Sequence, residues 1–158
     1  MKRILATIFI LLLAIMIVSP AAAQGEYYFA VESEVVNVYY NSDGTMSIDY
    51  QWVFVNQPSG HAIEYVDVGM PNGNFYMSTV SAEVNGELVT VSQGDYEGNG
   101  SGFAVVLGDR AIPAGQRGSV HVFVGKVENI LYPDDADELY ASAVFQPVYF
   151  GSQYVTGA

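Results

Sequence analysis

A strict alternation of large apolar residues in residues 46–54 constrains the fold of this chain more than any other feature. A period of two places these side chains on one face of a β-strand, whereas a helix needs a period near 3.6. An apolar segment, residues 35–40, precedes this strand, and the turn-forming sequence NSDG joins the two. Residues 35–56 therefore predict a β-hairpin at the centre of the fold. Its apolar face would carry Met46, Ile48, Tyr50, Trp52 and Phe54.

Short alternating segments separated by turn signals continue along the chain. Asn85-Gly86 is the clearest hairpin signal, because a type I′ turn needs positive φ at both central residues. In residues 27–40 the apolar positions change from odd to even, which predicts a bulge or a crossing between sheets. Residues 75–84 and 143–150 are expected to form one strand each, the latter at a sheet edge because of Pro147.

Eight or nine short strands without a helical period predict an all-β domain. The expected fold is an antiparallel β-sandwich of the immunoglobulin-like or jelly-roll type.

Residues 1–23 have the pattern of a secretory signal peptide. They begin with MKR, continue with an apolar run over residues 4–18 and end in SPAAA. This run is shorter than the roughly 20 residues of a membrane-spanning helix. We expect cleavage after Ala23, with an uncleaved N-terminal anchor as the alternative. Residues 24–158 would then form a single domain that is exported to the extracellular space or the cell envelope.

The expected mature chain is strongly acidic. All 17 acidic residues remain in it, against three basic ones, which gives a net charge of −14 with neutral histidines. Such a surface repels nucleic acid and anionic lipid headgroups, so the expected partner is a protein or a glycan. The charge also keeps a domain soluble. The chain has no cysteine, which excludes disulfides and a thiol nucleophile and is common in prokaryotic exported proteins. The three basic residues are Arg110, Arg117 and Lys126.

No catalytic motif stands out in the sequence. The Gly-x-Ser-x-Gly pattern of serine hydrolases is absent from the chain. The only imidazoles, His61 and His121, are far apart and are interpreted as surface or half-buried residues. No two carboxylates are marked as facing each other across a cleft, as glycoside hydrolysis requires. The prediction is therefore that the chain is not an enzyme, and a secreted hydrolase is the third alternative.

Calcium is the one cofactor that the sequence suggests. Hard cations prefer clustered oxygen ligands, and residues 134–138 hold four carboxylates. A smaller set consists of Asp95, Glu97 and Asn99. Neither matches an EF-hand loop, and the alternative is a solvated acidic loop. The candidate calcium ligands are Asp134, Asp135, Asp137 and Glu138.

Aromatic residues are abundant, with 12 Tyr, 8 Phe and 1 Trp. Several occur as adjacent pairs, and neighbouring residues of a strand point to opposite faces. One ring of each pair would point outward, which favours a binding face or a neighbouring domain. These pairs are Tyr27-Tyr28, Tyr39-Tyr40, Phe75-Tyr76 and Tyr149-Phe150.

The exported start, the Asp43-Gly44-Thr45 bend and the later Ile112-Pro113-Ala114-Gly115 turn resemble one group of proteins. These are the N-terminal extracellular β-sandwich domains of uncharacterised prokaryotic membrane and cell-envelope proteins. The resemblance implies a C-terminal anchoring helix, and hence a chain truncated at its C-terminus. Membrane attachment would then occur only through that missing anchor or an N-terminal one.

The predicted function is a non-catalytic ectodomain that presents a surface for adhesion, assembly or partner binding. The alternative is a carbohydrate-binding or calcium-stabilised module of a secreted protein.

Overall fold

The computed structural model describes residues 27–150, so the expected signal peptide and residues 151–158 lie outside the described residues. Nine strands and two short 3₁₀ turns make up this part of the chain. The sequence predicts eight or nine strands, but neither the 3₁₀ turns nor the short strand at residues 131–133. Among residues 27–150, no helix is long and apolar enough to cross a bilayer. The elements are β1 (Phe29–Tyr40), β2 (Met46–Asn56), β3 (Tyr65–Gly69), η1 (Met77–Thr79), β4 (Val80–Val84), β5 (Glu87–Ser92), β6 (Gly102–Val106), η2 (Gly108–Arg110), β7 (Arg117–Val127), β8 (Leu131–Pro133) and β9 (Ala141–Ala143).

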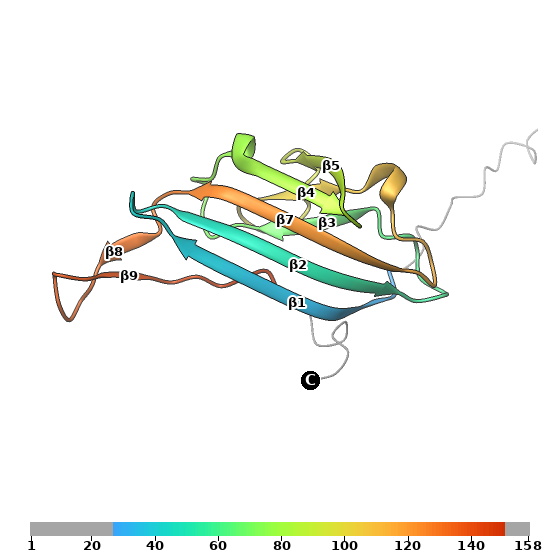
Figure 1. The fold of residues 1–158 in the computed structure, drawn as a ribbon, viewed down its shortest axis with the longest axis horizontal. Helices are drawn as coiled ribbons and strands as arrows, with labels where there is room; N and C mark the ends of the chain where they lie inside the picture. Colours follow the sequence, from blue (N-terminus) through green and yellow to red (C-terminus); the bar gives the residue numbers. More distant parts are fainter. Residues whose placement is uncertain (1–26, 151–158) are drawn as a thin grey trace, which may run out of the picture.

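Seven of the strands form one antiparallel sheet in the order β1-β2-β7-β4-β5-β6-β3. The sheet folds over at β5, whose residues 87–89 pair with β4 and whose residues 90–92 pair with β6. Strands that change layers in this way form the corners of β-sandwiches. β3 and β6 consequently lie behind the layer of β1, β2, β7 and β4 (Figure 1). The predicted antiparallel β-sandwich is confirmed.

The core lies between these layers. The five apolar residues of β2 are at most 1% exposed, as their alternation predicts. Trp52 is paired with Val120 of β7, and its ring stacks on Tyr50 with centroids 4.7 Å apart. The opposite layer contributes buried side chains from β3, from β6 and from the residue after β6: Val66, Val68, Phe103, Val105 and Leu107.

β1 forms one edge of the sheet. Its register with β2 shifts between Val31 and Ser33, which confirms the predicted bulge. The bulge residue Glu32 forms an ion pair with Arg117 of β7. Beyond the bulge, Val36 and Val38 face the core but are only half-buried, because the layer of β3 and β6 does not extend over them.

Of the strands expected at residues 75–84 and 143–150, the first is shorter than expected and the second is not formed. In residues 75–84 the ladder begins only at Val80, and Phe75 forms a single bridge to Val127. The intervening residues form η1, where the Thr79 backbone N–H donates to the Tyr76 carbonyl. In residues 143–150 the ladder ends at Ala143. Pro147 has no N–H to donate, which weakens any ladder at that point.

Residues 144–150, here called the strap, run back under β1 and β2 (Figure 1). Val144 and Tyr149 point to solvent, with exposed fractions of 75% and 70%, whereas Phe145, Val148 and Phe150 pack on the core. The strap therefore completes the second layer over β1 and β2. The Phe150 ring lies with its centroid 6.0, 6.1 and 5.3 Å from those of Phe29, Trp52 and Phe54.

Two polar atoms are buried beneath the strap. The hydroxyl of Tyr50 and the indole Nε1 of Trp52 have no hydrogen-bond partner among residues 27–150. The Val148 backbone faces the Tyr50 hydroxyl without reaching hydrogen-bond geometry. Burial raises the pKa of Tyr50 to about 12, because the phenolate would have to form out of contact with water.

Alkaline pH is expected to destabilise the fold through Tyr50. The unfolded chain releases this proton near pH 10 and the folded chain near pH 12. Stability should therefore fall by about 2 kcal/mol as the pH rises from 10 to 12. Urea unfolding of the wild type and Tyr50→Phe across this range isolates the effect, since the other tyrosines are shared. Equal slopes would contradict the prediction. At pH 7 the Phe variant should be at least as stable, because it removes an unsatisfied hydroxyl.

Candidate functional site

A shallow, open pocket lies where the β1–β2 turn meets the segment after β7, with a volume of about 360 Å³. We call it the polar pocket. Carboxylates from two distant parts of the sequence, Asp43 and Glu128, contribute to its lining. The other lining residues are Gly44, Thr45, Asn129, Ile130 and Leu131.

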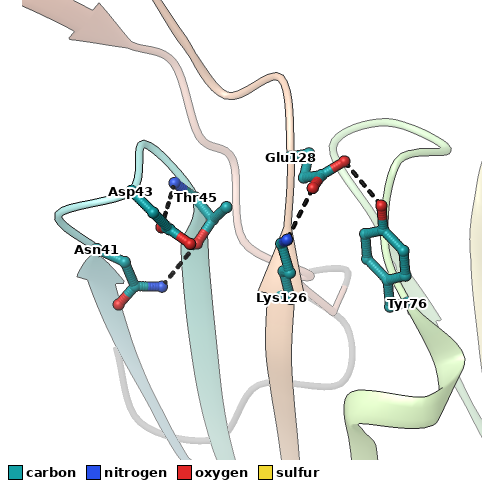
Figure 2. Close-up of polar contacts among 6 residues, drawn as sticks. All are labelled: Asn41, Asp43, Thr45, Tyr76, Lys126 and Glu128. Atoms are coloured by element: carbon teal, nitrogen blue, oxygen red, sulfur yellow. Dashed lines mark hydrogen bonds and ion pairs between the residues drawn. The ribbon is translucent and has the colours of Figure 1, made fainter.

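One wall of the polar pocket is the β1–β2 turn, which is held by its own side chains (Figure 2). Gly44 has φ of 81°, which glycine adopts readily. The Asp43 carboxylate accepts from the Thr45 hydroxyl at 2.7 Å and from its backbone N–H at 3.1 Å. These bonds lower the pKa of Asp43, the hydroxyl contributing most. Asn41 donates to Thr45 Oγ1 at 3.0 Å, which fixes the other side of the turn.

The facing wall centres on Glu128, whose carboxylate has two partners (Figure 2). Lys126 Nζ lies 2.8 Å from Oε1, and the Tyr76 hydroxyl donates to Oε2 at 2.9 Å. Lys126 also lies 5.2 Å from the centroid of the Tyr76 ring. The hydrogen bond from Lys126, followed by that from Tyr76, lowers the pKa of Glu128. Glu128 in turn raises the pKa of both Lys126 and Tyr76.

These lowered pKa values determine what the polar pocket can do. Asp43 and Glu128 are both ionised at neutral pH, so they accept hydrogen bonds and have no proton to donate as general acids. Lys126 partly offsets their charge. The pocket therefore suits groups that donate hydrogen bonds, such as hydroxyls, amides or ammonium groups.

Exposed large side chains lie on the elements that adjoin the walls of this pocket. We call them the tyrosine rim. They belong to the end of β1, which leads into the β1–β2 turn, to the segment before η1, where Tyr76 contacts Glu128, and to β8, where Leu131 lines the pocket. Their exposed fractions are 50% for Tyr39, 53% for Tyr40, 45% for Tyr76, 37% for Leu131 and 44% for Tyr132.

The prediction for adjacent aromatic pairs is confirmed in part. Phe75 and Phe150 are turned inward while their neighbours Tyr76 and Tyr149 are exposed. In Tyr39-Tyr40, however, both rings are exposed, because Tyr40 lies on the core face of β1 beyond the reach of the second layer. Both rings of Tyr27-Tyr28 are also exposed.

The four predicted calcium ligands lie in the exposed loop between β8 and β9. Asp134 accepts from the backbone N–H groups of Ala136 and Asp137 and from the Ser142 hydroxyl. The Ser142 bond is the main cause of its lowered pKa. Asp137 accepts from the Leu139 N–H at 3.0 Å, and Asp135 and Glu138 are exposed. Two of the four carboxylates thus shape the loop itself.

Within residues 27–150, no group of three or more His, Cys, Asp or Glu side chains has the arrangement of a metal site. The smaller set, which includes Asp95 and Glu97, lies in the glycine-rich loop of residues 93–102. In this loop the Glu97 N–H donates to Asp67 at 3.3 Å. Calcium binding remains a prediction for this chain.

The two histidines lie apart, as their positions in the sequence suggest. His61 Nδ1 lies 3.0 Å from the Ala62 carbonyl and its ring packs edge-on against Tyr27. His121, on the outer face of β7, has Nε2 3.2 Å from Asp49 and Nδ1 3.9 Å from Glu83. Within residues 27–150, neither histidine forms a hydrogen bond with a serine or threonine side chain.

Burial raises the pKa of the Asp67 carboxyl, the hydrogen bond from the Glu97 backbone N–H opposes this shift, and the charge of Glu97 adds to it. The Asp67 carboxylate anchors the glycine-rich loop through the Glu97 N–H.

Sequence reasoning missed the polar pocket. The sequence pattern indicates only a turn at Asp43 and gives no role to Glu128. One signal was available in the sequence, because residues 24–158 contain only three basic residues. Each of these is expected to pair with an acidic residue, and for Lys126 the partner is Glu128, two positions further along the chain at a strand end.

Comparisons with protein-family models, curated proteins and solved structures gave no match to this chain. The class is therefore defined by the fold and the site alone: residues 27–150 form an antiparallel β-sandwich from a folded seven-stranded sheet, with a separate β-hairpin, a polar pocket and exposed aromatic side chains.

Proposed function

We propose that the chain is a non-catalytic, exported module of the cell envelope that binds a partner through the polar pocket and the tyrosine rim. The signal-peptide pattern of residues 1–23 supports export. The observation that carries the binding proposal is that exposed tyrosine rings occur on the elements adjoining the pocket with the ionised hydrogen-bond acceptors Asp43 and Glu128. Rings of this kind supply contact area at a low cost in conformational entropy.

A glycan partner is the second candidate, and the same end of the molecule favours it. Sugar hydroxyls donate hydrogen bonds, which Asp43 and Glu128 accept. The apolar faces of sugar rings pack on aromatic side chains, which Tyr39 and Tyr132 present to solvent. The high negative charge does not oppose a neutral glycan.

Replacing the rim residues is expected to abolish binding without affecting the fold. A variant with Tyr39→Ser, Tyr40→Ser and Tyr132→Ser should bind intact exporting cells and purified cell-wall polysaccharides at least roughly tenfold more weakly. Leu88→Ser is the matched control, because Leu88 is 75% exposed on β5 and should leave binding unchanged. Circular dichroism confirms that each variant is folded.

Pretreatment of the cells shows whether the partner is a protein or a glycan. Binding that is lost after protease treatment indicates a protein, whereas binding that is lost after periodate oxidation indicates a glycan. Equal binding by the rim variant and the wild type would overturn the proposed site. No binding to cells or polysaccharides by the wild type would overturn the proposed function.

A further inference from the structure

The β8–β9 hairpin and the strap together form a C-terminal arm, residues 131–150. β8 and β9 pair with each other in a separate two-stranded sheet. This hairpin projects away from the seven-stranded sheet (Figure 1). Its loop and most of its strand residues are exposed, and the strap follows directly. A projecting hairpin that carries a core-forming segment is the arrangement from which arm exchange between subunits arises.

The strap is held by side chains and not by a β-ladder. Within the described residues no strand pairs with it, although β1 lies beside it at the sheet edge. Phe145, Val148 and Phe150 provide its contacts with the core. Apolar contacts lack the directional register that a ladder imposes, so the same contacts can form with an identical strap from elsewhere.

The buried polar atoms beneath the strap reduce the cost of lifting it. The Tyr50 hydroxyl and Trp52 Nε1 have no partner in the part of the chain that the structure describes, and both residues are at most 1% exposed. Unpaired buried donors are unfavourable, and water would satisfy both atoms if the strap were lifted. Hydrogen bonds to water thereby offset part of the free energy that is lost with the apolar contacts when the strap is lifted.

We propose that the chain forms a dimer by exchanging C-terminal arms, so that the strap of each copy covers the β1–β2 face of the other. The exchanged contacts repeat those within one chain, with Phe150 against Phe29, Trp52 and Phe54. The occupant is a second copy because this face is already complementary to the strap sequence. Each arm carries the acidic loop with Asp134, Asp135, Asp137 and Glu138, so salt should favour the dimer by screening repulsion between copies.

Single cysteines detect the exchange directly, because the native chain has none. Phe29→Cys and Phe150→Cys variants of the mature chain are mixed at high concentration, warmed, cooled and treated with a short bismaleimide crosslinker. A crosslink between position 29 of one copy and position 150 of the other is expected, since the native rings at these positions are in contact, with centroids 6.0 Å apart. Phe123→Cys with Phe150→Cys is the matched control: Phe123 pairs with Asp49 and Ser81 on the outer face and should give background crosslinking only.

Two further measurements keep the test decisive if a cysteine variant folds poorly. The double variant at low concentration should form the 29–150 crosslink within one chain, which shows that the reagent spans the two positions. Light scattering of the unmodified chain should show a dimer fraction at least roughly tenfold higher at 1 mM than at 10 µM, and higher again at raised salt. A chain that stays monomeric throughout overturns the proposal. A dimer without 29–150 crosslinks above the Phe123 control also overturns it.

Discussion

Trp52→Ala is expected to lower the free energy of unfolding by about 3–5 kcal/mol, the largest effect of any single substitution in the core. Trp52 is 1% exposed, stacks on the Tyr50 ring and packs against Phe150 of the strap. Truncation would leave a cavity between the stacked Tyr50 ring and the edge of Phe150, and the fixed strand register limits how far the neighbours can collapse into it. Urea unfolding followed by far-ultraviolet circular dichroism measures the change.

Two controls accompany this substitution. Trp52→Phe keeps an aromatic ring and removes the unpartnered Nε1, so it should cost less than half as much. Leu88→Ala removes a side chain that is 75% exposed and should stay within about 0.5 kcal/mol of the wild type. A Trp52→Ala protein with nearly wild-type stability would show that the aromatic row of β2 is not the centre of the core.

Asn56→Ala is expected to cost about 2–4 kcal/mol, because it removes a buried donor from two backbone carbonyls, of which the Ile112 carbonyl keeps its bond from the Ile63 N–H. Asn56 is 1% exposed at the end of β2, and its Nδ2 donates to the carbonyls of His61 and Ile112 at 2.8 and 2.9 Å. The side chain thereby joins β2 to two loops whose residues Ile63 and Ile112 form a bridge. The loss is measured by equilibrium unfolding.

Asn72 provides a closely matched comparison for this prediction. Its Nδ2 also donates to two backbone carbonyls, those of Glu128 and Asn129, at 3.0 and 3.2 Å, but near the surface. Water can replace these bonds, so Asn72→Ala should cost less than about 1 kcal/mol. Equal losses for the two alanine variants would mean that burial does not set the value of the Asn56 bonds.

Local pattern was sufficient to predict the individual hairpins. The period of two in β2 depends only on neighbouring residues, and its apolar side chains are buried as expected. Asn85 and Gly86 have φ of 52° and 83°, as a type I′ turn requires. The phase change in residues 27–40 likewise located the bulge at Val31 and Ser33.

Features that depend on distant partners were not predictable in the same way. The pattern of β5 is that of any short strand, and its position at the corner follows from pairing with β4 at one end and β6 at the other. The strap has the apolar composition of a strand, but whether it joins a ladder depends on the neighbouring edges. Asp43 and Glu128 meet because the β1–β2 turn and the end of β7 share one end of the sheet.

The contact between Phe29 and Phe150 sets the order of events during biosynthesis. The aromatic row of β2 is made early, yet its cover is among the last parts of the described chain to be made. A nascent chain therefore cannot complete this part of its core until the strap has been made. Contacts between such distant segments also slow folding. For the export that we propose, slow folding would keep the chain in an unfolded form while it passes through a narrow pore.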